Sequence, residues 1–390
     1  MRGRSANQRL LLVVGTAILL DTLFYAVITP LLPQLSHQLR LSKLSAGVMT
    51  AGYPAGMLIA SLPGGVLAVR RGPRFTVVSG VLLLVISTVA FGLLRSAPGL
   101  DLARFVEGVG GACSWAGGLA WIVAATEPER RGAVMGSALG TAIAGSLFGP
   151  AVGALASVVG RPGLFCALAA LALLLLVPIG ALPEEREPSE QPVAEVVKAL
   201  RRPPILGAMW LMVLPAIVSG ALNVLGPLQL HRLGAGAGLI GAVFVVGAAL
   251  EAVVSPAAGH FSDRHGRTLP LRGGLIGLAA ALACFTLPSN DVALGVLMVV
   301  TATVLGVFWA PVMALVADVA EAHRIDQAHA AALMNLAWAG GQIVGSAGSG
   351  AIGKAFGDAG PTLAVTALCL LTLVALRTRN REPRADQAPA

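Results

Sequence analysis

Twelve apolar stretches, each about long enough to cross a lipid bilayer as an α-helix, limit how this chain can fold. A helix needs roughly 20 mainly apolar residues to span the hydrocarbon layer. With 56% hydrophobic and 12% charged residues, the chain does not suit a water-soluble surface. We therefore expect an all-α membrane protein with twelve transmembrane helices. The predicted helices cover residues 10–32, 45–69, 74–95, 99–125, 132–157, 163–182, 205–229, 236–258, 269–287, 292–317, 328–352 and 361–377.

The sequence is also internally duplicated. When 194 is subtracted from the later residue numbers, two short basic turns align in sequence, and each lies between two long apolar segments. Sharp turns on the arginine-rich side of a membrane, repeated in two related halves, are typical of transporters whose halves move against each other. The matching positions are Gly65 and Gly259, Arg70 and Arg264, and Gly72 and Gly266.

The duplication predicts two pseudo-symmetric bundles of six helices. We place the first half in residues 1–182 and the second half in residues 205–377. Residues 183–204 begin rich in Glu and Pro and then become amphipathic, so we expect a cytoplasmic linker with a short helix on the membrane surface. Residues 378–390 would form a cytoplasmic tail.

Positive charges are distributed unevenly between the two sides of the predicted membrane protein. With the N-terminus inside, 20 of the 27 Lys and Arg residues fall on the inner side and six in the outer connections. The side richer in Lys and Arg is normally the cytoplasmic side. We therefore expect a multi-pass protein of the cell inner membrane with both termini in the cytoplasm. Because the positive charges gather on the cytoplasmic side of the lipid bilayer, the net charge of +8 does not require a nucleic-acid partner.

Asp21, near the middle of the first predicted helix, is the leading candidate for a functional site. An ionised carboxylate at this depth is costly unless it faces a water-filled cavity or a partner. Tyr25, one turn later, shares its face of the helix. We expect Asp21 to line a cavity, and the alternative is a protonated Asp21 that hydrogen-bonds to a neighbouring helix.

Three further charged residues deep within predicted membrane helices are site candidates. Arg104 and Glu107 are three residues apart and can neutralise each other, either as a structural ion pair or as part of a proton-coupling site. Glu251 lies in the eighth helix, where it would either couple protons or act as a hydrogen-bonded core acid. An interior with three acids and one base attracts protons and cations and disfavours anions.

Small residues recur every four positions in the fifth and eighth helices. This spacing allows another helix to approach backbone to backbone. We expect the two stripes to meet and form a hinge between the halves, with generic helix packing as the alternative. The fifth helix carries Gly145, Gly149 and Gly153 with Pro150 beside them, and the eighth carries Gly247, Glu251, Ser255 and Gly259.

Amides and one aromatic residue form a second group of site candidates. Asn335, Trp338 and Gln342 lie on one face of the eleventh helix, and the seventh helix supplies Asn223. A mixed polar and aromatic strip suits the wall of a ligand site, whereas core packing is the alternative for the aromatic residue.

Twelve helices in two related halves, with this turn after helices 2 and 8, resemble the major facilitator superfamily over residues 10–377. The second turn is similar to the family's helix 2–3 signature. The fourth helix is similar to the signature implicated in proton coupling, with Glu107 where the family usually has Gln. The fifth helix is similar to the antiporter signature. The quoted residues are Gly259, Asp263, Arg264, Gly266 and Arg267; Arg104, Glu107, Gly108, Gly110 and Gly111; and Gly145, Gly149, Pro150 and Gly153.

Two details refine this resemblance. The spacing of Asp21, Pro30 and Pro33 resembles that of the drug:proton antiporters, which include the tetracycline efflux proteins and the vesicular monoamine transporters.

In the family, an Asp in the first turn helps to latch the cytoplasmic side, but Val69 stands at that position here. The resemblance therefore implies an asymmetric latch, in which Asp263 acts on the N-terminus of the fifth helix near Arg131 and Gly132.

These features predict a proton-coupled antiporter that exports a lipophilic small molecule, cationic or neutral, by alternating access. Asp21 would be the principal proton or cation site, and Arg104 would pair with Glu107 or Asp21 in one conformation and release it in the other. The alternatives are efflux of a sugar or another neutral metabolite, and a transport-derived membrane sensor.

The sequence shows no metal-ligand spacing, no Ser/His/Asp set and no phosphate loop. We expect no cofactor, no metal and no enzymatic activity. The expected partners are protons and the small-molecule substrate, and we expect a monomer.

Overall fold

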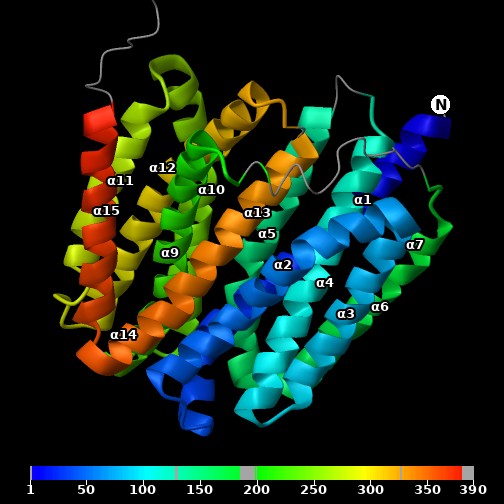
Figure 1. Ribbon diagram of the computed structural model, residues 1–390. Coiled ribbons are helices and arrows are strands. Elements are labelled where there is room, and N and C mark those ends of the chain that lie inside the picture. Colours follow the sequence, from blue (N-terminus) through cyan, green and yellow to red (C-terminus); the bar gives the residue numbers. More distant parts are fainter. Residues whose placement is uncertain (1, 128–130, 185–197, 199, 326, 380–390) are drawn as a thin grey trace, which may run out of the picture.

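The computed structural model describes residues 2–127, 131–184, 198, 200–325 and 327–379, and in these residues it contains helices and no strand. Helices of the first half gather on one side and those of the second half on the other (Figure 1). The first helix begins, and the last helix ends, at the same end of the molecule (Figure 1). Among the described residues, nine helices are long and apolar enough to cross a membrane. The predicted all-α membrane fold is confirmed.

The helices coincide with the twelve predicted apolar stretches. One crossing is divided into α6 and α7, and another is interrupted by a π-helix, η2. The first half contains α1 (Arg2–Gln38), α2 (Lys43–Arg71), α3 (Pro73–Leu93), α4 (Ala97–Ala124), α5 (Arg131–Val159), α6 (Arg161–Leu174) and α7 (Leu176–Ala181). The second half contains α9 (Pro203–Arg232), α10 (Ala237–His265), α11 (Thr268–Ala283), α12 (Asp291–Ala322), α13 (Gln327–Ile343), η2 (Val344–Gly348), α14 (Ser349–Phe356) and α15 (Ala359–Arg379). The predicted surface helix of the linker falls on residues 185–197 and 199, outside the described part of the chain.

Glycine explains the two duplicated turns. Gly72 separates α2 from α3 with φ at 98°, and Gly266 ends α10 with φ at 85°. Residues with a Cβ rarely adopt this region, whereas Gly does so at no steric cost. One glycine therefore reverses the chain between two membrane helices.

Helix pairing repeats from one half to the other. In the first half α1 packs against α5, α2 against α4, and α3 against α6. In the second half α9 packs against α13, α10 against α12, and α11 against α15. The corresponding helices thus have corresponding partners, as expected for a duplicated chain.

The glycine stripe of α5 packs against α1, so the predicted hinge between α5 and the eighth helix is wrong for these glycines. A Cβ on Gly145, Gly149 or Gly153 would collide with the α1 backbone. The colliding carbonyl oxygens belong to Leu19, Leu23 and Val27. These glycines therefore hold two helices of the same half together.

The small residues of α10 likewise serve pairing within the second half. A Cβ on Gly247 would lie 3.0 Å from the Cβ of Ala302, and one on Gly259 would lie 3.2 Å from that of Ala310, both in α12. Across the halves, α10 meets α5 at Gly241, where a Cβ would lie 3.1 Å from the Pro150 carbonyl oxygen. Of the predicted hinge residues, Pro150 does lie at the seam.

The second basic turn forms an ion-pair network within its own half. Arg267 donates to Asp318 of α12 at 2.6 Å and to Asp263 at 3.1 Å. Asp263 is exposed on its other sides. The side chains of Arg131 and Gly132, its expected partners on α5, lie outside the described residues. The latch involving Asp263 therefore stays a prediction.

The two halves are joined by one ion pair at the end of the molecule where α2 begins. Lys43 of α2 donates to Asp358, in the turn before α15, at 2.6 Å. Arg232, at the end of α9, pairs with the other oxygen of Asp358. Close by, a Cβ on Gly350 would lie 3.2 Å from the Cα of Leu44. Figure 1 shows α2 and α14 side by side at this end. The halves are thus closed on the side that the charge distribution predicts to be external.

Candidate functional site

Asp21 is sealed inside the first half. Its side chain is 0% exposed, and its Oδ2 accepts hydrogen bonds from the Tyr53 hydroxyl at 2.9 Å and from Trp115 Nε1 at 3.0 Å. Tyr53 lies on α2 and Trp115 on α4, so three helices of one half form the pocket. The expectation that Asp21 lines an open cavity is not met in this conformation. The predicted alternative, an acid bonded to neighbouring helices, describes it.

The other carboxyl oxygen of Asp21, Oδ1, has no hydrogen-bond partner. It faces Gly111 of α4, on which a Cβ would lie 2.5 Å from Oδ1 and 2.8 Å from the Tyr53 hydroxyl. A methyl group at Gly111 would therefore not fit without movement of Asp21 or Tyr53. The helices thus pack closely around the Asp21 carboxyl in this conformation.

Arg104 and Glu107 form the expected ion pair, and both side chains are buried. Arg104 Nη1 lies 2.9 Å from each carboxylate oxygen of Glu107. Arg104 also donates to two carbonyl oxygens of α1, those of Phe24 at 3.0 Å and Tyr25 at 3.1 Å. The guanidinium therefore ties α4 to α1 while its charge is balanced within α4.

An aromatic cluster crosses the seam between the halves. The rings of Tyr25 and Tyr53 lie 4.8 Å apart, and Trp338 of α13 meets Tyr25 edge-on at 5.6 Å. Asn223 of α9 donates to the Tyr25 hydroxyl at 3.2 Å. Two predicted residues of the second half, Asn223 and Trp338, thus converge on a predicted residue of the first.

The polar strip predicted on the eleventh helix does not act as one surface. Gln342 is buried and donates to Ser219 of α9 at 3.0 Å. Asn335 lies two turns away and is partly exposed. Trp338 alone of the three reaches Tyr25. Gln342 therefore holds α13 against α9, and the prediction that it walls a ligand site is not supported by its packing.

Glu251 of α10 is partly exposed and lies near Trp309 of α12. The backbone of α12 comes close because Gly306 has no side chain, since a Cβ there would lie 3.0 Å from the Cα of Glu251.

Sequence reasoning missed Tyr53 as a site residue. The chain contains two tyrosines, Tyr25 and Tyr53, and their rings pack against each other at a tilt beside Asp21. Their rarity in so apolar a chain was the one available signal. Trp115, which matches Trp309 under the shift of 194, likewise turns out to bond Asp21.

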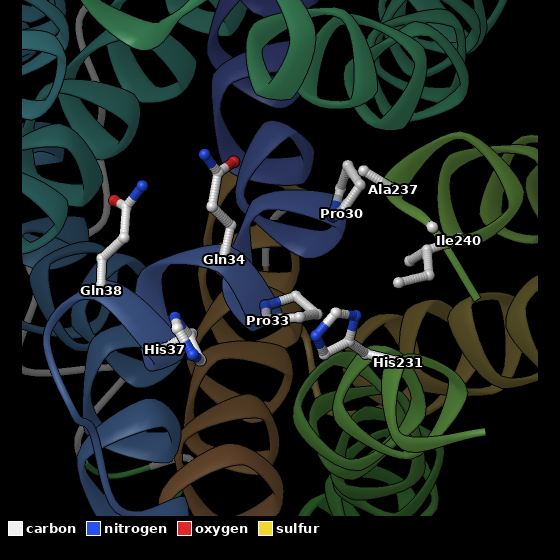
Figure 2. Close-up of a pocket in the computed structure, with 9 residues that line it drawn as sticks. Pro30, Pro33, Gln34, His37, Gln38, His231, Ala237 and Ile240 are labelled. Atoms are coloured by element: carbon white, nitrogen blue, oxygen red, sulfur yellow. The ribbon is translucent and has the colours of Figure 1, made fainter. Parts of the chain in front are cut away.

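A cavity of about 420 Å³ lies between α1 and the second half, nearer the closed end than Asp21. Figure 2 shows Pro30 and Pro33 of α1 facing His231 of α9 and Ile240 of α10. The cavity does not include Asp21. Its lining residues are Pro30, Pro33, Gln34, His37, Gln38, His231, Gly236, Ala237 and Ile240.

Several relatives of this chain are transporters by name. The synaptic vesicular amine transporter of Bos taurus is 28% identical over 311 residues, which cover 75% of this chain and 58% of that protein. Multidrug resistance protein 1 of Bacillus subtilis is 28% identical over 187 residues, which cover 46% of this chain and 48% of that protein. The chain thus spans about half the length of these relatives.

Solved structures share the fold at low sequence identity. A bacterial homolog of the human lysosomal transporter Spinster, in an inward-facing and unoccupied conformation, superimposes with a TM-score of 0.78 at 15% identity, over 96% of this chain and 97% of that one. A D-xylose-proton symporter gives a TM-score of 0.75 at 17% identity, over 94% of this chain and 96% of that one.

The sequence also matches a family model directly. The Major Facilitator Superfamily model aligns with residues 14–323 and again with residues 211–390. Together with the helical fold and the repeated helix pairing, this match over most of the length means that the chain belongs to the Major Facilitator Superfamily.

Proposed function

We propose that this protein is a proton-coupled antiporter that exports a lipophilic small molecule, cationic or neutral, by alternating access. The observation that carries the proposal is the Asp21 carboxyl, sealed among three helices with one oxygen unpartnered. A buried carboxyl without a basic partner costs least when it carries a proton. A group of this kind can bind a proton in one conformation and give it up in another.

The aromatic cluster supports a lipophilic substrate. Tyr25, Tyr53 and Trp338 bring three rings to the seam between the halves. Aromatic walls suit apolar ligands, and their ring faces also attract cations. The names of the relatives, an amine transporter and a multidrug resistance protein, agree with this class of substrate.

Sugar efflux is the second candidate, because one structural neighbour is a D-xylose-proton symporter. A sugar site needs side-chain amides that are free to bond hydroxyl groups. Here Gln342 bonds Ser219 and Asn223 bonds Tyr25, so two of the three candidate amides are engaged within the protein. This observation favours the lipophilic substrate.

The first test is efflux by the full chain in proteoliposomes. A pH gradient should drive movement of ethidium, a lipophilic cation, and excess xylose should not compete. Asp21→Asn should abolish gradient-driven movement, because an amide cannot take up and release the proton. Asp291→Asn, at the exposed start of α12, is the matched control and should keep the wild-type rate.

The outcomes separate the candidate functions. Gradient-driven movement that survives Asp21→Asn unchanged contradicts the role of Asp21. Competition by xylose would favour the sugar transporter. Absence of any protein-dependent flux of either compound would point to a membrane sensor.

A further inference from the structure

We infer that the second half binds one anionic phospholipid in a groove between α9 and α15, with Arg272 of α11 holding the lipid phosphate. The groove lies at the end of the molecule that the charge distribution predicts to be cytoplasmic. All of its lining residues belong to the second half. The inference does not depend on what the protein transports.

The groove has a volume of about 610 Å³ and is bordered by α9, α11, α12 and α15. Figure 1 shows α15 at the outer edge of the second half. Leu371 is 66% exposed and Trp210 is 39% exposed, so the groove opens on the outside of the bundle. Along α15 it extends from Leu368 to Leu376, which is about 12 Å of helix. One acyl chain can lie along a groove of this form.

The groove is polar at one end and apolar along the rest. Arg267 and Thr268 line it where α11 begins, at the predicted membrane surface. Deeper in the groove, the indole N–H of Trp210 donates to the Thr372 hydroxyl at 3.0 Å. That donor is therefore satisfied within the protein, and the Trp210 ring serves as an apolar wall. A ligand with a polar head at the membrane surface and an apolar chain toward the membrane interior matches this polarity.

Arg272, one turn after Thr268 on α11, supplies the charge for the lipid phosphate. It is partly exposed, and its Nη2 donates at 3.0 Å to the carbonyl oxygen of Leu376, a residue that lines the groove. Its Nε is buried without a hydrogen-bond partner. In the part of the chain that the structure describes, no carboxylate forms an ion pair with Arg272. A phosphate can accept hydrogen bonds from two N–H groups of such a guanidinium at once.

The other charged side chains at this end favour an anionic lipid head group. Arg267 is already balanced by Asp318 and Asp263, so it has less charge to offer than Arg272. Basic pockets between membrane helices on the cytoplasmic side bind anionic lipid head groups. Arginines outnumber acids around these helix ends, with Arg201, Arg202, Arg264, Arg267, Arg272 and Arg324 against Asp263, Asp318 and Glu321.

Native mass spectrometry of the purified full chain tests the inference with two lipids that share their acyl chains, dioleoyl phosphatidylglycerol and dioleoyl phosphatidylcholine. The wild-type protein should retain one phosphatidylglycerol molecule in preference to phosphatidylcholine. It should also unfold at a higher temperature when phosphatidylglycerol is added. Glycerol 3-phosphate offers the phosphate without the acyl chains, and it should neither compete nor stabilise.

Two pairs of variants separate the charge from the groove. Arg272→Gln should weaken the Kd for phosphatidylglycerol by about tenfold, because a hydrogen-bonded charge contact is lost. Arg272→Lys keeps the charge and should retain most of the affinity. Arg201→Gln removes the same charge from an exposed position at the same end, outside the groove, and is the matched control. Ala375→Phe should block the groove from its exposed edge, whereas Ala364→Phe, exposed elsewhere on α15, should bind as the wild type does.

Each contrary result removes a defined part of the inference. Equal affinity of the wild-type protein for the two lipids overturns recognition of an anionic head group. Competition by glycerol 3-phosphate would indicate a site for soluble phosphates and overturns the lipid assignment. Equal weakening by Arg272→Gln and Arg201→Gln would show only diffuse attraction to this end of the molecule. Thermal unfolding shows which variants are folded. If Arg272→Gln is not, loss of binding in Ala375→Phe supports the inference, and unchanged binding contradicts it.

Discussion

At the scale of single residues, the neighbours of Asp21 determine how accessible its carboxyl is, more than its depth in the membrane does. Two donors hold one oxygen, and Gly111 lies against the other. The sequence indicates the acid, because a charged residue in the middle of an apolar helix stands out. Tyr53 and Gly111 could not be foreseen, because nothing in their local sequence says that α2 and α4 meet α1 at this level.

Gly111→Ala tests the fit at this scale. The added methyl group would lie 2.5 Å from Asp21 Oδ1, so Asp21 or Tyr53 must move. We expect gradient-driven transport to be lost and the thermal unfolding temperature to fall, with overpacking costing about 1–3 kcal/mol. Gly273→Ala, on α11 with no atom within 4 Å of the new methyl, is the control. Unaltered transport by Gly111→Ala would show that the pocket is looser than described.

At the scale of helices, the hydrophobic pattern predicts where helices lie but not which ones pair. The glycine spacing of α5 correctly indicates a close approach to another helix. The partner of these glycines is α1 and not α10, because their missing side chains face the α1 backbone. Between the halves, α5 meets α10 at Gly241 and Pro150. A spacing rule describes one surface and carries no information about the surface it meets.

Two glycines of α5 allow a matched comparison. Gly145→Ala would place a methyl group against the Leu19 carbonyl oxygen and Thr22, and we expect a loss of stability of about 1–3 kcal/mol. Gly140→Ala, in the same helix with open space around the new methyl, should be neutral or stabilise by up to about 1 kcal/mol. Thermal unfolding in one detergent compares them, and an equal shift for both would contradict the packing of α5 on α1.

At the scale of the whole molecule, Asp358 links the two halves at the closed end. It binds Lys43 of the first half and Arg232 of the second, so one carboxylate serves as the partner of both cations. The Lys43–Asp358 pair that crosses the halves is partly buried, with side chains 29% and 13% exposed. Ion pairs near a surface contribute roughly 0–1 kcal/mol each, which is small enough to be broken in a transport cycle. The pair is therefore suited to bias a conformational equilibrium and not to fix it.

Asp358→Asn should shift this equilibrium toward conformations in which this end is open. Spin labels at Arg40 and Phe356, both exposed near the closed end, would report the change as a larger fraction of long distances. The four native cysteines are replaced beforehand. Asp291→Asn should leave the distances unaltered. An identical distance distribution in Asp358→Asn would mean that other contacts close this end.

The pocket of Asp21 has one further consequence for turnover. It is built from α1, α2 and α4, so it can travel with the first half as a rigid unit. The second half reaches it through the hydrogen bond from Asn223 to Tyr25. Such a bond contributes about 1 kcal/mol, and thermal motion breaks it readily. Rocking of the two bundles alone would then leave the Asp21 carboxyl enclosed. Release of a proton from it would also require α1 to move relative to α2 and α4.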